Sequence, residues 1–207
     1  MRNQVPVPTD KTDEQPISTP MNVLYFNPDE MRADLLGCYG HELAQTPNFD
    51  RFAASGTRFD QCHVQHTVCT PSRCSFMTGW YPHTRGHRTL WHLLRPDEPN
   101  TLKYLKQAGY DVQWLGKNDL LATASFADSV TRVMLPWDDG PGSGGGNPYD
   151  PDAPEYMSFL YAAPEGAPQS GLVAQAIDYL RQRKDGDPPF MLYLPWGLPH
   201  CPYKVPE

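Results

Sequence analysis

The chain contains the run Asn100-Thr101-Leu102-Lys103-Tyr104-Leu105-Lys106-Gln107-Ala108-Gly109, which leads directly into Tyr110 to Leu115. A capping Asn at the start, apolar residues at helical spacing and a closing Gly predict a helix over the first part. The apolar residues from 110 to 115 predict a strand. The segment therefore predicts a helix followed by a strand of an α/β domain.

Short apolar runs on either side of this segment predict two more strands. Asn22 to Phe26 and Pro189 to Leu194 both have the composition of strands that are covered on both faces. Two further helices are expected, one from Thr46 to Gly56, with a capping Thr, a first-turn Pro and a final Gly, and one from Leu172 to Arg183. This alternation favours a largely parallel central sheet flanked by helices on both faces.

Composition and charge exclude several classes of protein. The 207 residues include 17 Lys+Arg and 24 Asp+Glu, for a net charge of -7. An acidic chain without a basic stripe argues against a nucleic-acid partner. No apolar run reaches the roughly 18 residues that cross a bilayer, so no membrane association is expected. Five cysteines are an odd number, which argues against a disulfide framework.

Two segments are expected to lie outside the packed core. Residues 1–20 are polar and Pro-rich, which predicts a flexible arm and, because no apolar signal region is present, a cytoplasmic protein. Residues 136–155 are rich in Gly and Pro, which predicts a long loop. The chain has 23 prolines, about twice the average usage.

Polar residues follow three of the predicted strands. Asp29-Glu30 comes after the first, Lys117 after the second and His200 after the last. In parallel α/β sheets, ligands bind beyond the carboxyl ends of the strands. We therefore expect these side chains to meet at one edge of the sheet.

Cys69 precedes a helix that Pro71 is expected to open and Gly79 to close. A helix N-terminus and the nearby Arg73 both favour an anion, which predicts a reactive thiol. A buried structural thiol is the alternative. Zinc is a third interpretation, although the available residues lack two regular ligand pairs; they are Cys62, His63, His66, Cys69 and Cys74.

The string Cys69-Thr70-Pro71-Ser72-Arg73 resembles the signature of the type I sulfatases, whose Cys is oxidised to formylglycine (3-oxoalanine). These enzymes belong to the alkaline-phosphatase-like superfamily. The resemblance covers residues 21–207. Further matching positions, in order, are Asn22-Val23-Leu24, Asp29, Arg32, Asp34, Leu36-Gly37-Cys38-Tyr39-Gly40, Thr46-Pro47-Asn48, Asp50-Arg51, Gly56, Met77-Thr78-Gly79, Tyr81-Pro82, Gly116-Lys117 and Pro199-His200-Cys201-Pro202.

This resemblance implies hydrolysis of a sulfate ester of a small molecule or a carbohydrate. Cys69, converted by a formylglycine-generating enzyme, becomes the nucleophile. A divalent cation, Ca²⁺ by the family pattern, is held by Asp29, Glu30 and the modified Cys69. Arg73 is implied to hold this cluster in place. Lys117 and His200 are implied to contact the sulfate oxygens or the leaving oxygen.

Three features depart from the family pattern. Glu30 stands where a second aspartate is usual, and Asp119 stands where a histidine is usual. The family's later half has no counterpart here, so we expect an amino-terminal part of a sulfatase domain with an incomplete sheet, open to association with a second copy. The alternatives are a phosphonate or phosphate ester hydrolase, against which Ser72 argues, and a non-catalytic fragment.

Overall fold

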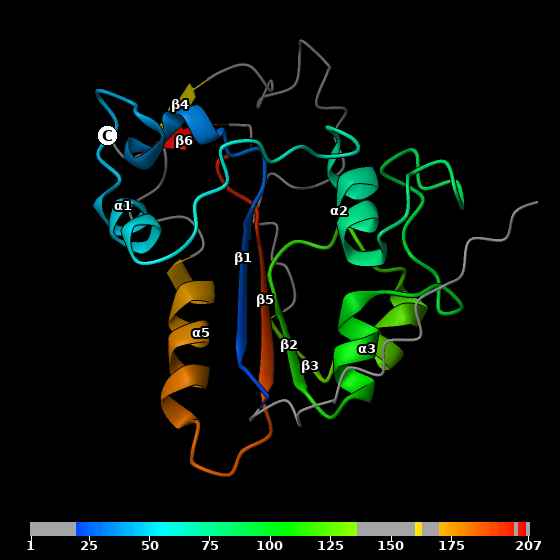
Figure 1. Ribbon diagram of the computed structural model, residues 1–207. Helices are drawn as coiled ribbons and strands as arrows, with labels where there is room; N and C mark the ends of the chain where they lie inside the picture. Colours follow the sequence, from blue (N-terminus) through cyan, green and yellow to red (C-terminus); the bar gives the residue numbers. More distant parts are fainter. Residues whose placement is uncertain (1–19, 136–159, 163–169, 201–202, 206–207) are drawn as a thin grey trace, which may run out of the picture.

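The structure is a computed structural model that describes residues 20–135, 160–162, 170–200 and 203–205. Most of the predicted arm and the whole of the predicted loop at 136–155 lie outside the described residues. Figure 1 shows a central sheet with helices on both of its faces. Within the described residues, no helix is long and apolar enough to cross a membrane.

Four parallel strands form the central sheet. They run in the order β1 (Val23–Pro28), β5 (Phe190–Trp196), β2 (Asp111–Leu115) and β3 (Arg132–Leu135). A second, two-stranded parallel sheet pairs β4 (Leu160–Ala162) with β6 (Tyr203–Val205). The predicted parallel α/β architecture is confirmed.

The helices cover the two faces of the sheet. α5 (Ser170–Gln182) lies on one side of the sheet, whereas α2 (Cys69–Thr78) and α3 (Thr101–Gln107) lie on the other (Figure 1). The shorter elements are α1 (Pro47–Ala54), α4 (Phe126–Ser129) and three 3₁₀ turns at Ala33–Leu35, Gly37–Tyr39 and Thr123–Ser125.

Each face of the sheet carries its own hydrophobic core. Under α2 and α3, Trp114 packs edge-to-face on Tyr193, with ring centroids 4.9 Å apart. Under α5, buried Leu192 and Phe190 belong to the second core. Alternate residues of β5 thus serve opposite faces, as the strand period of two requires.

The prediction that the first strand is covered on both faces is wrong for the described residues. Leu24 is 55% exposed and Phe26 is 40% exposed. β1 is an edge strand of the described sheet, and the second core lies between α5 and the neighbouring β5. One face of β1 therefore remains outside both cores.

The caps confirm two helix starts and correct a third. Asn100 accepts a hydrogen bond from the backbone N–H of Lys103 at 2.8 Å, as predicted for α3. Thr46 is the N-cap residue of α1 and Pro47 is its first residue, as predicted, although the Thr46 side chain donates to Asp50 and accepts from the N–H of Gly37 instead of capping the helix. α2 begins at Cys69 rather than at Pro71, because the first-turn N–H groups of a helix need no intrahelical partner and a proline is tolerated there.

Gly116 sets the path of the chain between the end of β2 and Lys117. Its φ is +123°, and a Cβ there would overlap the carbonyl oxygen of Pro195 in β5. That same oxygen accepts a hydrogen bond from the N–H of Lys117 at 2.9 Å. Only glycine combines this conformation with this close approach.

We expect Gly116→Ala to lower the free energy of unfolding by about 2 kcal/mol or more. The strain of an alanine at this positive φ adds to the overlap of its Cβ with the Pro195 carbonyl oxygen. Urea denaturation of both proteins measures this effect. Gly171→Ala in α5 is the control, since a Cβ there meets nothing within 4 Å; it should leave stability unchanged or raise it by up to about 1 kcal/mol. Equal stability of the two variants would contradict the role of Gly116.

Candidate functional site

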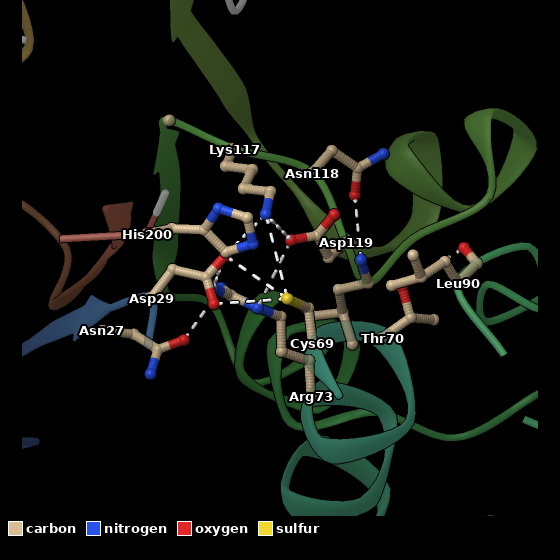
Figure 2. A network of polar contacts seen from close by, with 12 residues as sticks. Asn27, Asp29, Cys69, Thr70, Arg73, Leu90, Lys117, Asn118, Asp119 and His200 are labelled. Atoms are coloured by element: carbon tan, nitrogen blue, oxygen red, sulfur yellow. Dashed lines mark hydrogen bonds and ion pairs between the residues drawn. The ribbon is translucent and has the colours of Figure 1, made fainter. Parts of the chain in front are cut away.

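The site lies at the carboxyl edge of the parallel sheet. Asp29 directly follows β1, Lys117 follows β2 through Gly116, and His200 follows β5 by four residues. Figure 2 shows their side chains converging on Cys69, the first residue of α2. The expectation that residues after three different strands meet at one edge is therefore confirmed.

The thiol of Cys69 lies against a carboxylate. Its Sγ is 3.3 Å from Asp29 Oδ1 and 3.5 Å from Asp29 Oδ2, so the S–H donates to Asp29. Lys117 Nζ is 3.9 Å from the same sulfur. The sulfur thus lies between an anion and a cation, both supplied by strand ends.

Lys117 bridges two carboxylates. Its Nζ donates to Asp29 Oδ2 at 2.5 Å and lies 2.9 Å from Asp119 Oδ2. The second contact is an ion pair, so the charge of the buried Asp119 Oδ2 is compensated by Lys117. Asp119, which departs from the family pattern, is therefore built into the charge network.

Arg73 is buried beneath this network. Its Nη1 donates to Asn27 Oδ1 at 2.8 Å and to the hydroxyl of Tyr193 at 3.2 Å. Its guanidinium also forms ion pairs with Asp29 at 3.6 Å and Asp119 at 3.8 Å. Two cations, Arg73 and Lys117, therefore face two carboxylates, and their formal charges cancel.

The pKa values follow from burial and from these neighbours. Burial raises the pKa of the Cys69 thiol to about 11; Lys117 acts to lower it, whereas the carboxylates of Asp29 and Asp119 act to raise it. Burial alone would lower the pKa of Lys117, but Asp119 and Asp29 raise it to about 12. Burial would raise the pKa of Asp29, but Lys117 and Arg73 hold it below its usual value.

These values correct the expectation of an anionic thiol at Cys69. The helix N-terminus and Arg73 were expected to favour the thiolate, but burial and two carboxylates have the larger effect. At neutral pH the unmodified side chain is a neutral thiol that donates a hydrogen bond.

Asp29, Cys69 and His200 form a group with metal-ligand chemistry. One ligand atom from each lies within 4.8 Å of the other two. Glu30, the other carboxylate named from the sequence, is not in this group: its side chain is 51% exposed, its φ is +60°, and its carboxylate is 3.9 Å from His200 Nε2. The structure thus brings together five of the six residues expected at the site and leaves Glu30 at its rim.

The zinc interpretation of the sequence is wrong. The five residues named for it all lie within the described part of the chain, yet no three of them bring ligand atoms together. Cys74 is buried, with its Sγ 4.0 Å from the backbone carbonyls of His92 and Leu120. The four described cysteines are free thiols.

Two residues of the site were missed from the sequence. Asn27 and Tyr193 hold Arg73 from β1 and β5. The signal for Asn27 was present, because a polar residue within an apolar strand next to its carboxyl end needs a partner. Tyr193 gave no such signal, since tyrosine is common in buried strands.

The fold and the site define a parallel α/β domain. At the carboxyl edge of its sheet, the strand ends and the first turns of α2 bring together a thiol, two cations and two carboxylates. The family model described as Sulfatase matches residues 21–207. The chain therefore belongs to the sulfatase family. The solved structure of a phosphonate monoester hydrolase of Agrobacterium radiobacter, at 21% identity and a TM-score of 0.64 over 91% of this chain and 43% of that one, has the same fold.

Several relatives are similar over most of this chain. It is 30% identical to the N-acetylglucosamine-6-O-sulfatase of Bacteroides thetaiotaomicron, over 83% of this chain and 29% of the relative. It is also 30% identical to human iduronate 2-sulfatase, over 90% of this chain and 36% of the relative. A structure described as a complex with its substrate D-glucosamine-2-N,6-O-disulfate is 28% identical, with a TM-score of 0.67 over 88% of this chain and 35% of that one. The chain thus spans about a third of the length of these relatives.

The raised pKa predicts slow alkylation of unmodified Cys69. With iodoacetamide in the presence of a chelator, its rate should still rise between pH 9 and 10, because the thiol ionises only near its pKa of about 11. Exposed Cys62 should react first. Peptide mass spectrometry at timed intervals separates the two sites.

Asp29→Asn is the matched test, because it removes the negative charge beside the sulfur and leaves the S–H a single, neutral acceptor. It should speed alkylation of Cys69 at pH 8 by about tenfold for each unit by which the pKa falls, and leave Cys62 unchanged. Equal rates at Cys69 and Cys62 in the unsubstituted protein at pH 8 would contradict this account.

Proposed function

We propose that this chain is the amino-terminal part of an enzyme that hydrolyses sulfate esters, with residue 69 as its nucleophile. The observation that carries the proposal is the position of Cys69 at the first turn of α2, 3.3 Å from Asp29 and 3.9 Å from Lys117. The names of the relatives support the same reaction class. A nucleophile here would meet its substrate beyond the carboxyl ends of the strands.

The nucleophile that we propose is formylglycine made from Cys69. The conversion breaks the C–S bond, forms C=O and releases sulfide; it is a two-electron oxidation, so the formylglycine-generating enzyme must use an oxidant such as dioxygen. Once the aldehyde is hydrated to a diol, one oxygen attacks sulfur, the S–O bond of the ester breaks and the alcohol leaves with a proton. The second hydroxyl then loses its proton and re-forms C=O, which breaks the C–O bond to the transferred group and expels sulfate. The neutral, half-buried thiol supports this proposal because it is itself a poor nucleophile at neutral pH.

The surrounding side chains orient this group and the sulfate. Arg73, buried and tied to Asn27 and Tyr193, fixes the Asp29 carboxylate beneath residue 69. Lys117, whose side chain is 22% exposed, is the cation that can reach a sulfate oxygen. His200 lies in the same cluster and would contact another sulfate oxygen or the leaving oxygen.

A divalent cation fits the donor chemistry of the site. Asp29 offers a buried carboxylate, and one ligand atom each from Asp29, residue 69 and His200 lies within 4.8 Å of the other two. Because the formal charges of the two cations and two carboxylates cancel, a bound cation would add the positive charge that a sulfate ester needs. We propose Ca²⁺, held by Asp29, Glu30 and the oxygen of modified residue 69, with Glu30 turning inward from the rim.

A sulfated sugar is the substrate class that the comparisons favour. The two relatives are named for sugar sulfates, and the matched complex is described as holding a sulfated glucosamine. A phosphonate or phosphate ester hydrolase and a non-catalytic fragment remain the alternatives, and the assays below separate them.

Formylglycine is tested on the tryptic peptide from Phe59 to Arg73, from protein purified from its natural host. Fragment ions should place an aldehyde at residue 69 and an intact thiol at Cys62, the control within the same peptide. An intact thiol at residue 69, in a host that modifies other sulfatases, would contradict the proposed nucleophile.

The Cys69→Ala variant should lose more than about 10³-fold of sulfate release from an aryl sulfate, and neither protein should cleave a phosphonate at a comparable rate.

The cation is tested by binding and by activity. Titration calorimetry should show Ca²⁺ binding that Asp29→Asn abolishes and that Glu30→Gln weakens by about tenfold, because a charged ligand is replaced by a neutral one. Chelation should stop sulfate release, and added Ca²⁺ should restore it. Arg32→Gln, at an exposed ion pair with Asp34, is the control. Unchanged binding in Asp29→Asn would contradict the assignment.

A further inference from the structure

A hollow opens beside α2, outside the cluster around Cys69. Its volume is about 400 Å³, and it is bounded by the loop that follows α2 and by the turn after Asp119. The residues that line it are Arg85, His87, Trp91, His92, Leu93, Arg95, Ala122 and Thr123. Nothing in the proposed reaction uses these side chains, although the volume is in the range of small-ligand sites.

Trp91 is the most unusual residue of this hollow. It is 86% exposed, whereas tryptophan is on average among the more buried residues. Its only hydrogen bond among the described residues is from its backbone N–H to Thr89 Oγ1. Both the apolar ring and the indole N–H are therefore available to a ligand. A ring with an apolar face and a polar edge suits a sugar.

The hollow also carries an uncompensated positive charge. Arg95 is engaged by Glu98 at 2.9 Å and lies 4.0 Å from Asp97. Arg85 lies over the ring of Trp80, 5.8 Å from its centroid, and no carboxylate in the described part of the chain pairs with it. An anionic group in this hollow would meet Arg85 and the indole N–H.

The floor of the hollow is fixed. His87 is buried; its Nδ1 is 2.5 Å from the carbonyl oxygen of His92, and its Nε2 is 3.1 Å from Glu98 Oε1. Leu94 pairs with Leu121 as a bridge between the two bounding segments. The hollow is therefore held in shape before a ligand arrives, which reduces the entropy cost of binding.

A hydrogen bond connects the hollow to the candidate site. Thr70, the residue after Cys69, donates from Oγ1 to the carbonyl oxygen of Leu90 at 3.3 Å, as Figure 2 shows. Leu90 directly precedes Trp91. A ligand held on Trp91 is thus on a segment tied to the first turn of the helix that presents residue 69.

We propose that this hollow binds a second, anionic sugar unit of a sulfated oligosaccharide, next to the unit whose sulfate enters the candidate site. Trp91 stacks on the sugar ring, and Arg85 pairs with its sulfate or carboxylate. The inference takes its substrate class from the proposed function. Binding at the hollow, however, requires neither formylglycine nor turnover.

The test is equilibrium binding by titration calorimetry of the full chain carrying Cys69→Ala, at fixed salt. The probes are a sulfated tetrasaccharide, its desulfated counterpart and inorganic sulfate. We expect Trp91→Ala to weaken tetrasaccharide binding about tenfold or more, and Trp91→Phe to restore most of it, because a ring face is retained. Arg85→Gln should weaken binding about fivefold and reduce its dependence on salt.

Arg88→Gln is the matched control, because Arg88 is an exposed arginine of the same loop that does not line the hollow. It should bind the tetrasaccharide like the parent. Equal affinity of Trp91→Ala and the parent, or equal affinity for the sulfated and desulfated sugars, would overturn the proposal. Absence of sulfate release from the protein with residue 69 unsubstituted, together with intact tetrasaccharide binding, would count against the proposed function alone.

Discussion

The buried carboxylate of Asp29 is the interaction on which the site depends. A carboxylate taken out of water is costly unless charges and hydrogen bonds replace the solvent. Here the replacement comes from Lys117 after β2, from Arg73 in α2 and from the S–H of Cys69. One anion therefore ties together the ends of two strands and the start of a helix, and it sets where residue 69 can lie.

Much of this arrangement could be predicted from the sequence because it follows from local chemistry. Asn100 and Gly109 mark the limits of α3, and parallel strands bring Asp29 and Lys117 to one edge. The position of the Glu30 side chain could not be predicted, because it depends on the left-handed backbone conformation of Glu30 itself. That conformation separates its carboxylate from the carboxylate of Asp29. The start of α2 was placed two residues late, because a proline marks the first turn of a helix and not a particular position within it.

Asp119 shows how a tertiary contact changes the interpretation of a residue. From the sequence alone, an acidic residue two positions after Lys117 is expected to repel a sulfate ester bound there. In the structure, Asp119 faces both Lys117 and Arg73, so its charge is compensated within the network. The repulsion is replaced by a different constraint, because the network as a whole is neutral and has no surplus positive charge for an anionic substrate. That constraint is the physical reason to expect a cation.

The same neutrality bears on the chemical state of residue 69. A thiol that reacts as a nucleophile needs surroundings that stabilise the thiolate, such as a cation without a competing anion. Cys69 has Lys117 at 3.9 Å but Asp29 at 3.3 Å, and burial raises its pKa to about 11. A carboxylate at that distance instead favours a group that donates a hydrogen bond. The hydrated aldehyde that we propose has two hydroxyls, so one of them could donate to Asp29 and leave the other for the reaction. The surroundings of residue 69 therefore suit an oxygen nucleophile better than a thiolate.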